Sequence, residues 1–487
     1  MKACPHPMVV VRVKPLTPRP PSATTPSRPP ARCPPVTDLD PNALPSLRTP
    51  IPGPASLAWL NRLRAVESAN VTAIGDDFPV VWTAARGGAV QDADGNVYVD
   101  ATSAFGVALI GHGHPAVVAA VQRQAATLLH AMGDVHPAQA KVELLEALQR
   151  VVPPGLGGAV LCTGGSEAVE VALKTALLVS GKPGVIAFHG AYHGLGHGAL
   201  DATSRRDFRT PFWTQLARNV AWVPFPRADR PPVGVVAGDV AAHVLGRIDE
   251  LLTHPSAGGM PIGALLLEPV QGRAGTVIPP PGFVSALRQL CSDRGVLLIA
   301  DEIFTGLGRT GAVWACQREG VVPDLLCIGK ALGGGMPIAA CVGRPEVMAA
   351  WGPSQGEALH TSTFLGHPVA CAAATAALRV VVADDVPALA QRAGERWIAA
   401  LHEAIGAHPA VREIRGAGLM IGIELRDYAG VSAKSRAWQL VVGALRRGVV
   451  LLPAGAGGEV VQLTPPVVLS DAQRAAVVDA AAAALDA

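Results

Sequence analysis

Val-Leu-Leu-Ile-Ala-Asp301-Glu302 and Leu-Leu-Cys-Ile-Gly-Lys330 are the two stretches that decide the fold class of this sequence. Each is an apolar run that ends in a charged residue. A strand that is apolar throughout is normally buried on both faces of a parallel sheet. Ligands in such sheets bind just beyond the carboxyl ends of the strands. The two stretches therefore predict an α/β fold that presents Asp301 and Lys330 at a ligand-binding edge.

An acid and an amine at that edge suit one kind of cofactor. Pyridoxal 5′-phosphate needs a lysine for a covalent anchor and an aspartate that pairs with its pyridinium nitrogen. A buried Asp301–Lys330 ion pair is the plainer alternative, because paired charges do occur in protein cores. The residues around the pair favour the cofactor, since three glycines, Gly333 to Gly335, follow the lysine closely.

The rest of the chain predicts two folded domains. Between Leu161 and Asn219 strands alternate with helices, and further short apolar strands follow as far as Gly329, a pattern typical of a parallel sheet. After Gly366 the pattern changes to two helices, short strands and more helices, which indicates a smaller α+β domain. The predicted organisation is a disordered Pro-rich leader over 1–55, an N-terminal segment joining the small domain over 56–115, a large cofactor-binding domain over 116–365 and a C-terminal small domain over 366–487.

Composition narrows the classes of partner. Charged residues make up 16% of the 487, and the mean hydropathy is +0.33, so part of the surface is expected to be buried in an oligomer. A net charge of +2 without a dense basic run argues against nucleic acid. The eight cysteines show no CxxC pairing, which favours reduced thiols in the cytoplasm. No apolar run approaches the ~20 residues that cross a bilayer, so no membrane partner is expected.

The segment from Asp301 to Gly311, followed by Pro323-Asp324 and Lys330, resembles the signature of the class III aminotransferases. That family includes ornithine, acetylornithine and 4-aminobutyrate aminotransferases and glutamate-1-semialdehyde aminomutase. The resemblance runs from about Phe78 to about Pro466. Its other blocks begin at Asp94, Gly111, Gly165, Tyr192, Glu268, His360 and Arg415. The resemblance implies the fold type I architecture, with a large domain carrying a mostly parallel sheet, and a homodimer or dimer of dimers.

The resemblance also implies a set of cofactor contacts. Lys330 would form the Schiff base and Asp301 would hold the ring nitrogen protonated. The other implied contacts are Gly165 and Ser166 at the phosphate, Tyr192 and Ile303 on the two faces of the ring, and Ser362 and Thr363 reaching the phosphate across the dimer interface. By themselves, a glycine turn or two loop hydroxyls would be structural features.

Other polar residues near these blocks have alternatives. Glu268 and Gln271 end a core strand, and the resemblance implies support of the ring or the substrate, although a structural role is about as frequent. Glu302 is expected to set local hydrogen bonding. His189, His193 and His197 have a spacing that metal ligands use on a helix, but the glycines among them oppose a helix, so no metal site is expected.

The activity implied is an aminotransferase that moves an amino group between an amino acid or amine and an oxo acid. An aminomutase, epimerase or decarboxylase of the same family remains the alternative. Relatives that use 2-oxoglutarate carry an arginine where this sequence has Gln462, a second arginine where it has Leu195, and a glutamate where it has Arg273. A glutamine lacks the charge and the second parallel donor of a guanidinium. The sequence therefore predicts poor use of 2-oxoglutarate. Arg273 is a candidate for holding a substrate carboxylate, and a solvated surface arginine is the equally weighted alternative.

Overall fold

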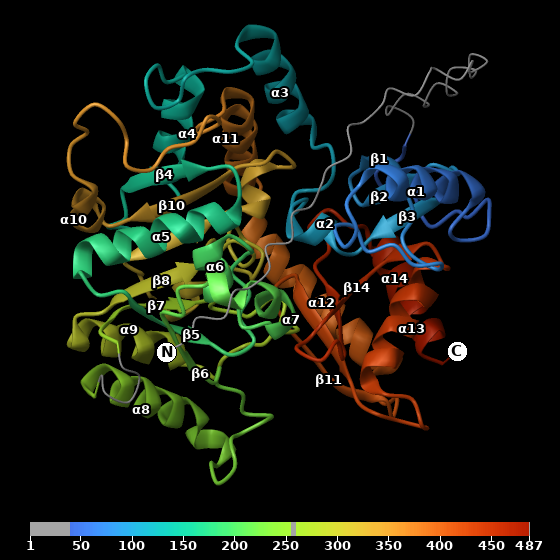
Figure 1. Ribbon diagram of the computed structural model, residues 1–487. Helices are drawn as coiled ribbons and strands as arrows, with labels where there is room; N and C mark the ends of the chain where they lie inside the picture. The colour runs from blue at the N-terminus through green and yellow to red at the C-terminus, as the bar shows by residue number, and fades with distance from the viewer. Residues whose placement is uncertain (1–38, 255–259, 487) are drawn as a thin grey trace, which may run out of the picture. The chain divides into compact units, whose positions relative to one another are not determined.

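The computed structural model describes residues 39–254 and 260–486, and its largest element is a seven-stranded sheet (Figure 1). In sheet order the strands are β4 (Gly158–Cys162), β10 (Ala339–Gly343), β9 (Leu325–Ile328), β8 (Leu297–Asp301), β7 (Ile262–Leu267), β5 (Gly184–Phe188) and β6 (Val220–Val223). Neighbours from β9 to β6 pair in parallel, whereas β10 runs antiparallel to both β4 and β9. The predicted α/β class with a mostly parallel sheet is confirmed.

Helices cover both faces of this sheet. Successive side chains of a strand point to opposite faces, so each apolar strand contributes to two cores. In β7, Leu265 and Leu267 belong to one core, while Leu266 belongs to the other. The first core also takes apolar residues from α3 (Pro115–Thr127), α4 (Gln139–Gln149), α8 (Val240–Thr253), α9 (Phe283–Arg294) and α11 (Pro368–Ala383). The second core takes residues from α5 (Gly165–Ser180).

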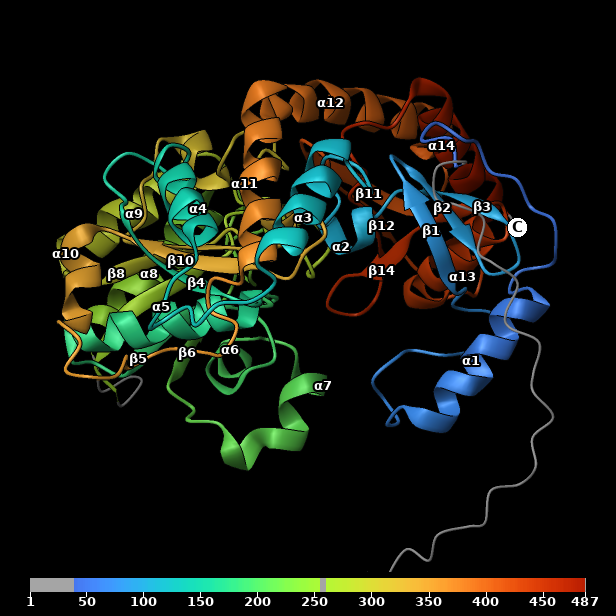
Figure 2. The same ribbon diagram turned by 90° about the horizontal axis from the view of Figure 1, so that it is seen from above.

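A third core lies in the C-terminal part of the chain. Its antiparallel sheet has the order β11 (Val411–Ala417), β12 (Met420–Leu425), β15 (Val460–Leu463) and β14 (Leu452–Ala454). Three helices contribute apolar residues to this core, α12 (Val386–Ile405), α13 (Ala433–Leu445) and α14 (Asp471–Leu485). Figure 2 shows α12 leading from the end of α11 toward α14.

The N-terminal part pairs with this C-terminal part. A four-stranded sheet has the order β1 (Trp82–Arg86), β2 (Ala89–Asp92), β3 (Val97–Asp100) and β13 (Val449–Val450). Strand β3 is parallel to β13. Val99 and Ala101 are buried in the same core as the C-terminal helices. Segments far apart in the sequence thus share one sheet and one core.

The turn between β2 and β3 differs from the two-residue hairpin turn that Asp94-Gly95 indicates in the sequence. A type I′ turn requires a positive φ at both central residues, but here Gly95 has φ +79° and Asp94 does not share the left-handed region. The backbone of Gly95 donates to the carbonyl of Asp92, and the Asp92 carboxylate accepts from the N–H groups of Asp94 and Asn96. The Asp92 side chain therefore stabilises a longer loop.

Two predicted boundaries are wrong in part. Residues 1–38 of the predicted leader lie outside the described residues, but the leader does not extend to 55 as a disordered segment. Ser46 forms a β-bridge with Val97, and Leu39 is buried against Ala89 and Val97. The predicted start of the small domain at 366 is also too early. Helix α11 packs on α3 and α4 in the first core, because it is apolar on nearly all sides.

The remaining elements are short, apart from the first helix. They are α1 (Pro54–Val66), α2 (Ser103–Gly106), α6 (His197–Asp201), α7 (Arg206–Arg209), η2 (Thr210–Gln215), η3 (Ala237–Asp239), η5 (Ala315–Glu319), η6 (Lys330–Gly333), α10 (Pro345–Met348) and η7 (Ala349–Trp351). Within 39–254 and 260–486, none of the helices combines the length and the apolar character needed to span a bilayer.

Candidate active site

The carboxyl ends of β8 and β9 bring the two predicted catalytic residues to one cavity. Asp301 is the last residue of β8 and pairs in register with Cys327 of β9, while Lys330 follows β9 after Gly329. The cavity has a volume of ≈380 Å³. It is lined by Gly165, Ser166, Tyr192, His193, Gly194, Leu195, Glu268, Arg273, Asp301, Ile303, Phe304 and Lys330. Most of the residues predicted from the sequence therefore converge at one place.

The Lys330 side chain is an amine tuned by its surroundings. Burial lowers the pKa of Lys330 from 10.5 to about 8, although Asp301 and Glu268 act in the opposite direction. Its Nζ lies 3.7 Å from the centroid of the Phe304 ring. A Cβ on Gly272 would come 2.3 Å from the Phe304 ring, so a glycine is required there. An amine with this pKa is partly neutral near physiological pH, and it can act as a nucleophile or a base.

Asp301 is held by a histidine to which the sequence interpretation assigned no role. Its Oδ2 lies 2.7 Å from Nδ1 of His193, and its Oδ1 accepts a hydrogen bond from the backbone of Ile303 at 3.1 Å. His193 is buried, and its Nε2 has no partner among the described residues. The signal in the sequence was its place directly after Tyr192. His189, by contrast, stacks on Trp222 at 5.7 Å.

The start of α5 contributes Gly165 and Ser166 to the lining of the cavity. The first N–H groups of a helix have no partner within the helix and attract anions. Ser166 accepts a hydrogen bond from the backbone of Gly196 at 2.8 Å, which fixes the turn next to the histidine loop. A Cβ on Gly165 would lie 2.9 Å from Ile303, so a glycine allows the turn to approach that side chain closely. Thr163 donates to Glu167 and ties the preceding loop to the helix.

Two side chains border the cavity as the resemblance implies for the faces of a flat ring. Ile303 packs against Gly165 and Gly329. The Tyr192 ring contacts Phe208, with centroids 6.0 Å apart, and burial raises the pKa of its hydroxyl. Both side chains line the cavity.

The three predicted substrate residues have different positions. Glu268 accepts from the backbones of Tyr192 and Gly272, both at 2.9 Å, and burial raises its pKa. Gln271 does not line the cavity, because its amide donates to the carbonyl of His189 at 3.0 Å. Arg273 does line the cavity, and its Cζ lies 5.9 Å from the centroid of the Tyr192 ring. The geometry thus leaves Arg273 available to a ligand and uses Gln271 to hold the loop.

Other predicted residues lie apart from the cavity. Thr363 is exposed, Ser362 is half-buried with an Oγ that has no partner among the described residues, and neither lines the cavity of this chain. Glu302 points away from it and accepts from the backbones of Ala315 and Cys316 at 2.9 and 2.8 Å. Its role is to order the loop after Asp301, as the sequence indicated.

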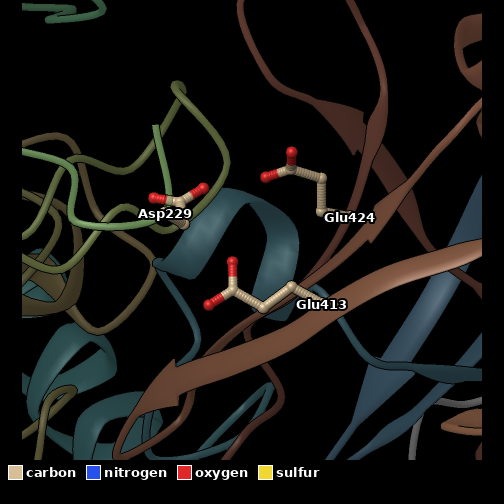
Figure 3. A group of neighbouring side chains, drawn as sticks. All are labelled: Asp229, Glu413 and Glu424. Atoms are coloured by element: carbon tan, nitrogen blue, oxygen red, sulfur yellow. The ribbon is translucent and has the colours of Figure 1, made fainter. Parts of the chain in front are cut away.

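Figure 3 shows three carboxylates, Asp229, Glu413 and Glu424, whose oxygen atoms lie within 4.8 Å of one another. Arginines occupy these oxygens. Arg415 donates to Glu413 at 2.5 Å and to Glu424 at 2.6 Å, and Arg227 bonds Asp229 at 2.6 Å and Glu424 at 3.0 Å. A metal ion would compete with these cations, so the group is an ion-pair network that joins the loop after β6 to β11 and β12.

Pyridoxal phosphate fits the observed donors. The cavity offers one amine of lowered pKa, one buried carboxylate that is hydrogen-bonded to a histidine, and the N-terminal turn of a helix within the same lining. Asp301 would hold the ring nitrogen, the start of α5 would hold the phosphate, and Ile303 and Tyr192 would border the ring. When bound, this cofactor supplies an aldehyde that condenses with amines and a ring that accepts electrons from the substrate carbon.

Comparison with known proteins gives the same assignment. Residues 71–485 match the family described as Aminotransferase class-III. An acetylornithine aminotransferase of Methanopyrus kandleri is 39% identical over 350 residues, which are 72% of this chain and 82% of that protein. The ornithine aminotransferase of Toxoplasma gondii ME49 has a TM-score of 0.76 at 28% identity and covers 88% of this chain and 94% of its own.

Transaminases of other kinds are also similar in structure. A PLP-bound amine transaminase from an uncultivated Pseudomonas species has a TM-score of 0.78 at 28% identity, covering 86% of this chain and 98% of its own. An (S)-enantioselective omega-transaminase from Thermomicrobium roseum has a TM-score of 0.80 at 27% identity, covering 88% and 98%. These likenesses confirm the predicted fold, resemblance and cofactor. The chain belongs to the class III aminotransferases and is a pyridoxal-phosphate-dependent transaminase.

Proposed function

We propose that this transaminase takes its amino acceptor from the small oxo acids, such as pyruvate, and uses 2-oxoglutarate poorly. The observation that carries the proposal is the position of Gln462. Its Nε2 donates to the carbonyl of Gly272 at 2.9 Å and to Oγ1 of Thr276 at 3.0 Å, and the residue is buried. The amide is therefore engaged within the protein, where an arginine would present a charged fork to a carboxylate.

The cavity wall supports the same proposal. Leu195, which replaces the second arginine of relatives that use 2-oxoglutarate, lines the cavity with an apolar side chain that is 52% exposed. The loss of a hydrogen-bonded charge pair costs about 1.5–3 kcal/mol. Two such losses would weaken binding of a dicarboxylic acceptor by two orders of magnitude or more, as about 1.4 kcal/mol corresponds to tenfold.

Arg273 is the residue that we assign to a substrate carboxylate. Its guanidinium lines the cavity, and its Nε has no partner among the described residues. Burial and the neighbouring Arg205 lower its pKa, which supports the assignment because an anion bound beside the guanidinium would favour its charged form. A carboxylate bound there would lie near Tyr192, since the guanidinium carbon is 5.9 Å from the centroid of that ring.

We assign two proton-handling roles to the lysine and the aspartate. The Lys330 amine, once free, would move the proton at the carbon that carries the substrate nitrogen, because its lowered pKa matches a neutral working pH. Asp301 would keep the ring nitrogen protonated, and the His193 hydrogen bond at 2.7 Å would keep that carboxylate in place. A mutase or epimerase is the second candidate. Such an enzyme needs no external acceptor, so it is compatible with a Gln462 amide that is engaged within the protein and cannot bind an acceptor carboxylate.

A half-reaction screen tests the proposal. Purified enzyme would be mixed with single amines and amino acids, including ornithine and acetylornithine, which are named for similar proteins, and the loss of the lysine-bound cofactor absorbance would be followed. Pyruvate and 2-oxoglutarate would then be compared as acceptors in the reverse half-reaction. Lys330→Ala is the inactive control. Efficient use of 2-oxoglutarate, undiminished in Arg273→Ala, would refute the assignment of the acceptor.

We also infer a homodimer or a dimer of dimers, with Ser362 and Thr363 serving the site of the partner subunit. The support is their exclusion from the cavity of their own chain and the unpartnered Oγ of Ser362. Sedimentation with simultaneous activity measurement tests this inference, and an active monomer would contradict it. We further infer a cytoplasmic location, since the described cysteines are free and buried.

A further inference from the structure

A second cavity adjoins the active site. It has a volume of ≈720 Å³ and shares Arg273 with the first cavity. Its wall is contributed by the segment around α7, the exposed face of α13 and the glycine-rich loop between β14 and β15. We call this second cavity the outer chamber. Its volume lies within the ~300–1,000 Å³ of sites that hold drug-sized ligands.

Positive charge dominates the outer chamber. Four cationic residues line it, Arg205, Arg206, Arg273 and Lys434, against a single acid, Asp207. Arg205 already holds Asp207 through two hydrogen bonds of 3.1 and 2.6 Å. In the described part of the chain, Arg206, Arg273 and Lys434 form no ion pair with a carboxylate. Cations that line the same cavity repel one another, and this repulsion is relieved when an anion binds among them.

The cations come from elements that are far apart in the sequence. Arg206 lies on α7, Arg273 follows β7, and Lys434 lies on α13 of the C-terminal region. The backbone of Gly455 donates to the carbonyl of Arg273 at 3.0 Å, so the glycine loop is tied to the residue between the cavities. Trp438, one turn after Lys434, is 43% exposed and adds an apolar face to the wall. The fold thus builds one chamber that is cationic and partly aromatic, and that shares Arg273 with the cavity lined by Lys330.

We propose that the outer chamber binds the anionic tail of a small-molecule substrate whose amine or oxo group reaches Lys330 past Arg273. The tail carries a phosphate or carboxylate group that lies among Arg206, Arg273 and Lys434. This proposal rests on the transaminase function, because the reacting end has to enter the first cavity. The substrate class is therefore an elongated amine, or the matching oxo compound, with an acidic group distant from the reacting carbon.

Anion binding by the holoenzyme tests the chamber without any turnover. With the cofactor bound, its own phosphate would occupy the start of α5, so added anions would have to bind elsewhere. Inorganic pyrophosphate and heptanedioate would be titrated separately by calorimetry into the wild type, Arg206→Gln and Lys434→Gln. Lys182→Gln, an exposed lysine before β5 at the opposite edge of the sheet, is the matched control. We expect about tenfold weaker binding in the two chamber variants, because each variant loses one charge-assisted contact. Binding to the Lys182→Gln control should be unchanged.

The outcomes separate the two kinds of tail. A charge-dependent preference for pyrophosphate supports a phosphate tail, and a preference for heptanedioate supports a carboxylate tail. Equal binding in wild type and both chamber variants, or no binding of either probe at millimolar concentration, overturns the proposal. A second arm compares aminohexyl phosphate with hexylamine as donors. Lys434→Gln should raise KM about tenfold for the phosphate compound, with kcat unchanged and with no effect on hexylamine.

The failure of this proposal can be distinguished from failure of the proposed acceptor. If hexylamine reacts normally but neither anion binds, the outer chamber has no anion site and the transaminase assignment stands. If 2-oxoglutarate proves efficient while the anions still bind through Arg206 and Lys434, only the acceptor assignment fails.

Discussion

The titration of the Lys330 amine in the cofactor-free enzyme reports directly on how the active site is built. Burial lowers its pKa to about 8, Asp301 and Glu268 act to raise it, and Arg273 acts to lower it. At about pH 7.5 such an amine is neutral in roughly a quarter of the molecules, against about 0.1% for an ordinary lysine. The protein therefore increases the nucleophilic form more than a hundredfold, by roughly 3 kcal/mol of differential interaction.

Two single substitutions should move this pKa in opposite directions. Glu268→Gln removes a carboxylate that favours the charged amine, so the pKa of Lys330 should fall. Arg273→Gln removes a cation that opposes it, so the pKa should rise. A change of about one pKa unit in either direction would bring the neutral fraction at pH 7.5 to about three-quarters or about 3%. Glu403→Gln, at an exposed position on α12, is the matched control and should leave the titration unchanged.

Trace acetylation across a pH series provides the assay. Cofactor-stripped enzyme would be labelled briefly with acetic anhydride, a free lysine derivative would serve as internal standard, and the Lys330 peptide would be quantified by mass spectrometry. The midpoint of labelling is expected near pH 8 in the wild type. A midpoint near 10.5, or a shift of both variants in the same direction, would refute the account of the site.

Three further predictions concern cofactor and stability. Asp301→Asn should retain the cofactor absorbance but lose roughly a hundredfold or more of the half-reaction rate, because an amide cannot hold the ring proton; normal rates would assign that proton to another group. Gly165→Ala should weaken cofactor affinity in a fluorescence titration, since its Cβ would lie 2.9 Å from Ile303, whereas Gly246→Ala, which meets no atom within 4 Å, should not. Glu424→Gln should lower the free energy of unfolding at neutral pH by about 3 kcal/mol, because arginines would remain buried without their carboxylate. Burial acts to raise the pKa of Glu424, but Arg415 and its neighbours hold that pKa below the usual 4.5. The stabilisation is therefore present above pH 4.5 and is lost as the carboxylate is protonated at lower pH. The difference in unfolding free energy between the two proteins, measured by urea, should shrink below that pH, and a constant difference would contradict the pairing.

Local sequence was sufficient for the elements that carry the chemistry. The short apolar strands predicted as far as Gly329 include β7, β8 and β9. Strands that are buried on both faces must be apolar at every position, so this pattern can be recognised without any knowledge of their partners. The places of Asp301 and Lys330 at strand ends follow from the same pattern.

Strand order was decided by the tertiary structure. Ala339–Gly343 forms β10, which the sequence interpretation did not include, and it lies between β4 and β9 in antiparallel pairing. The run is short and follows a glycine-rich loop, so its own residues carry little strand signal. Its position comes from pairing with β4, which precedes it by more than 170 residues in the chain. Similarly, α11 is recognisable as a helix from its sequence, but the core in which it packs is known only from its contacts with α3 and α4.

The residues that set specificity are long-range in the same sense. His193 and Asp301 are separated by 108 residues, and Gln462 and Gly272 by 190. The outer chamber joins Arg206, Arg273 and Lys434 from three separate elements. By itself the sequence determined the family, the cofactor and the two central charged residues, because these depend on local runs and on blocks in a fixed order. Which polar groups remain available to a ligand was decided only by tertiary structure, because availability depends on partners that the chain brings together when it folds.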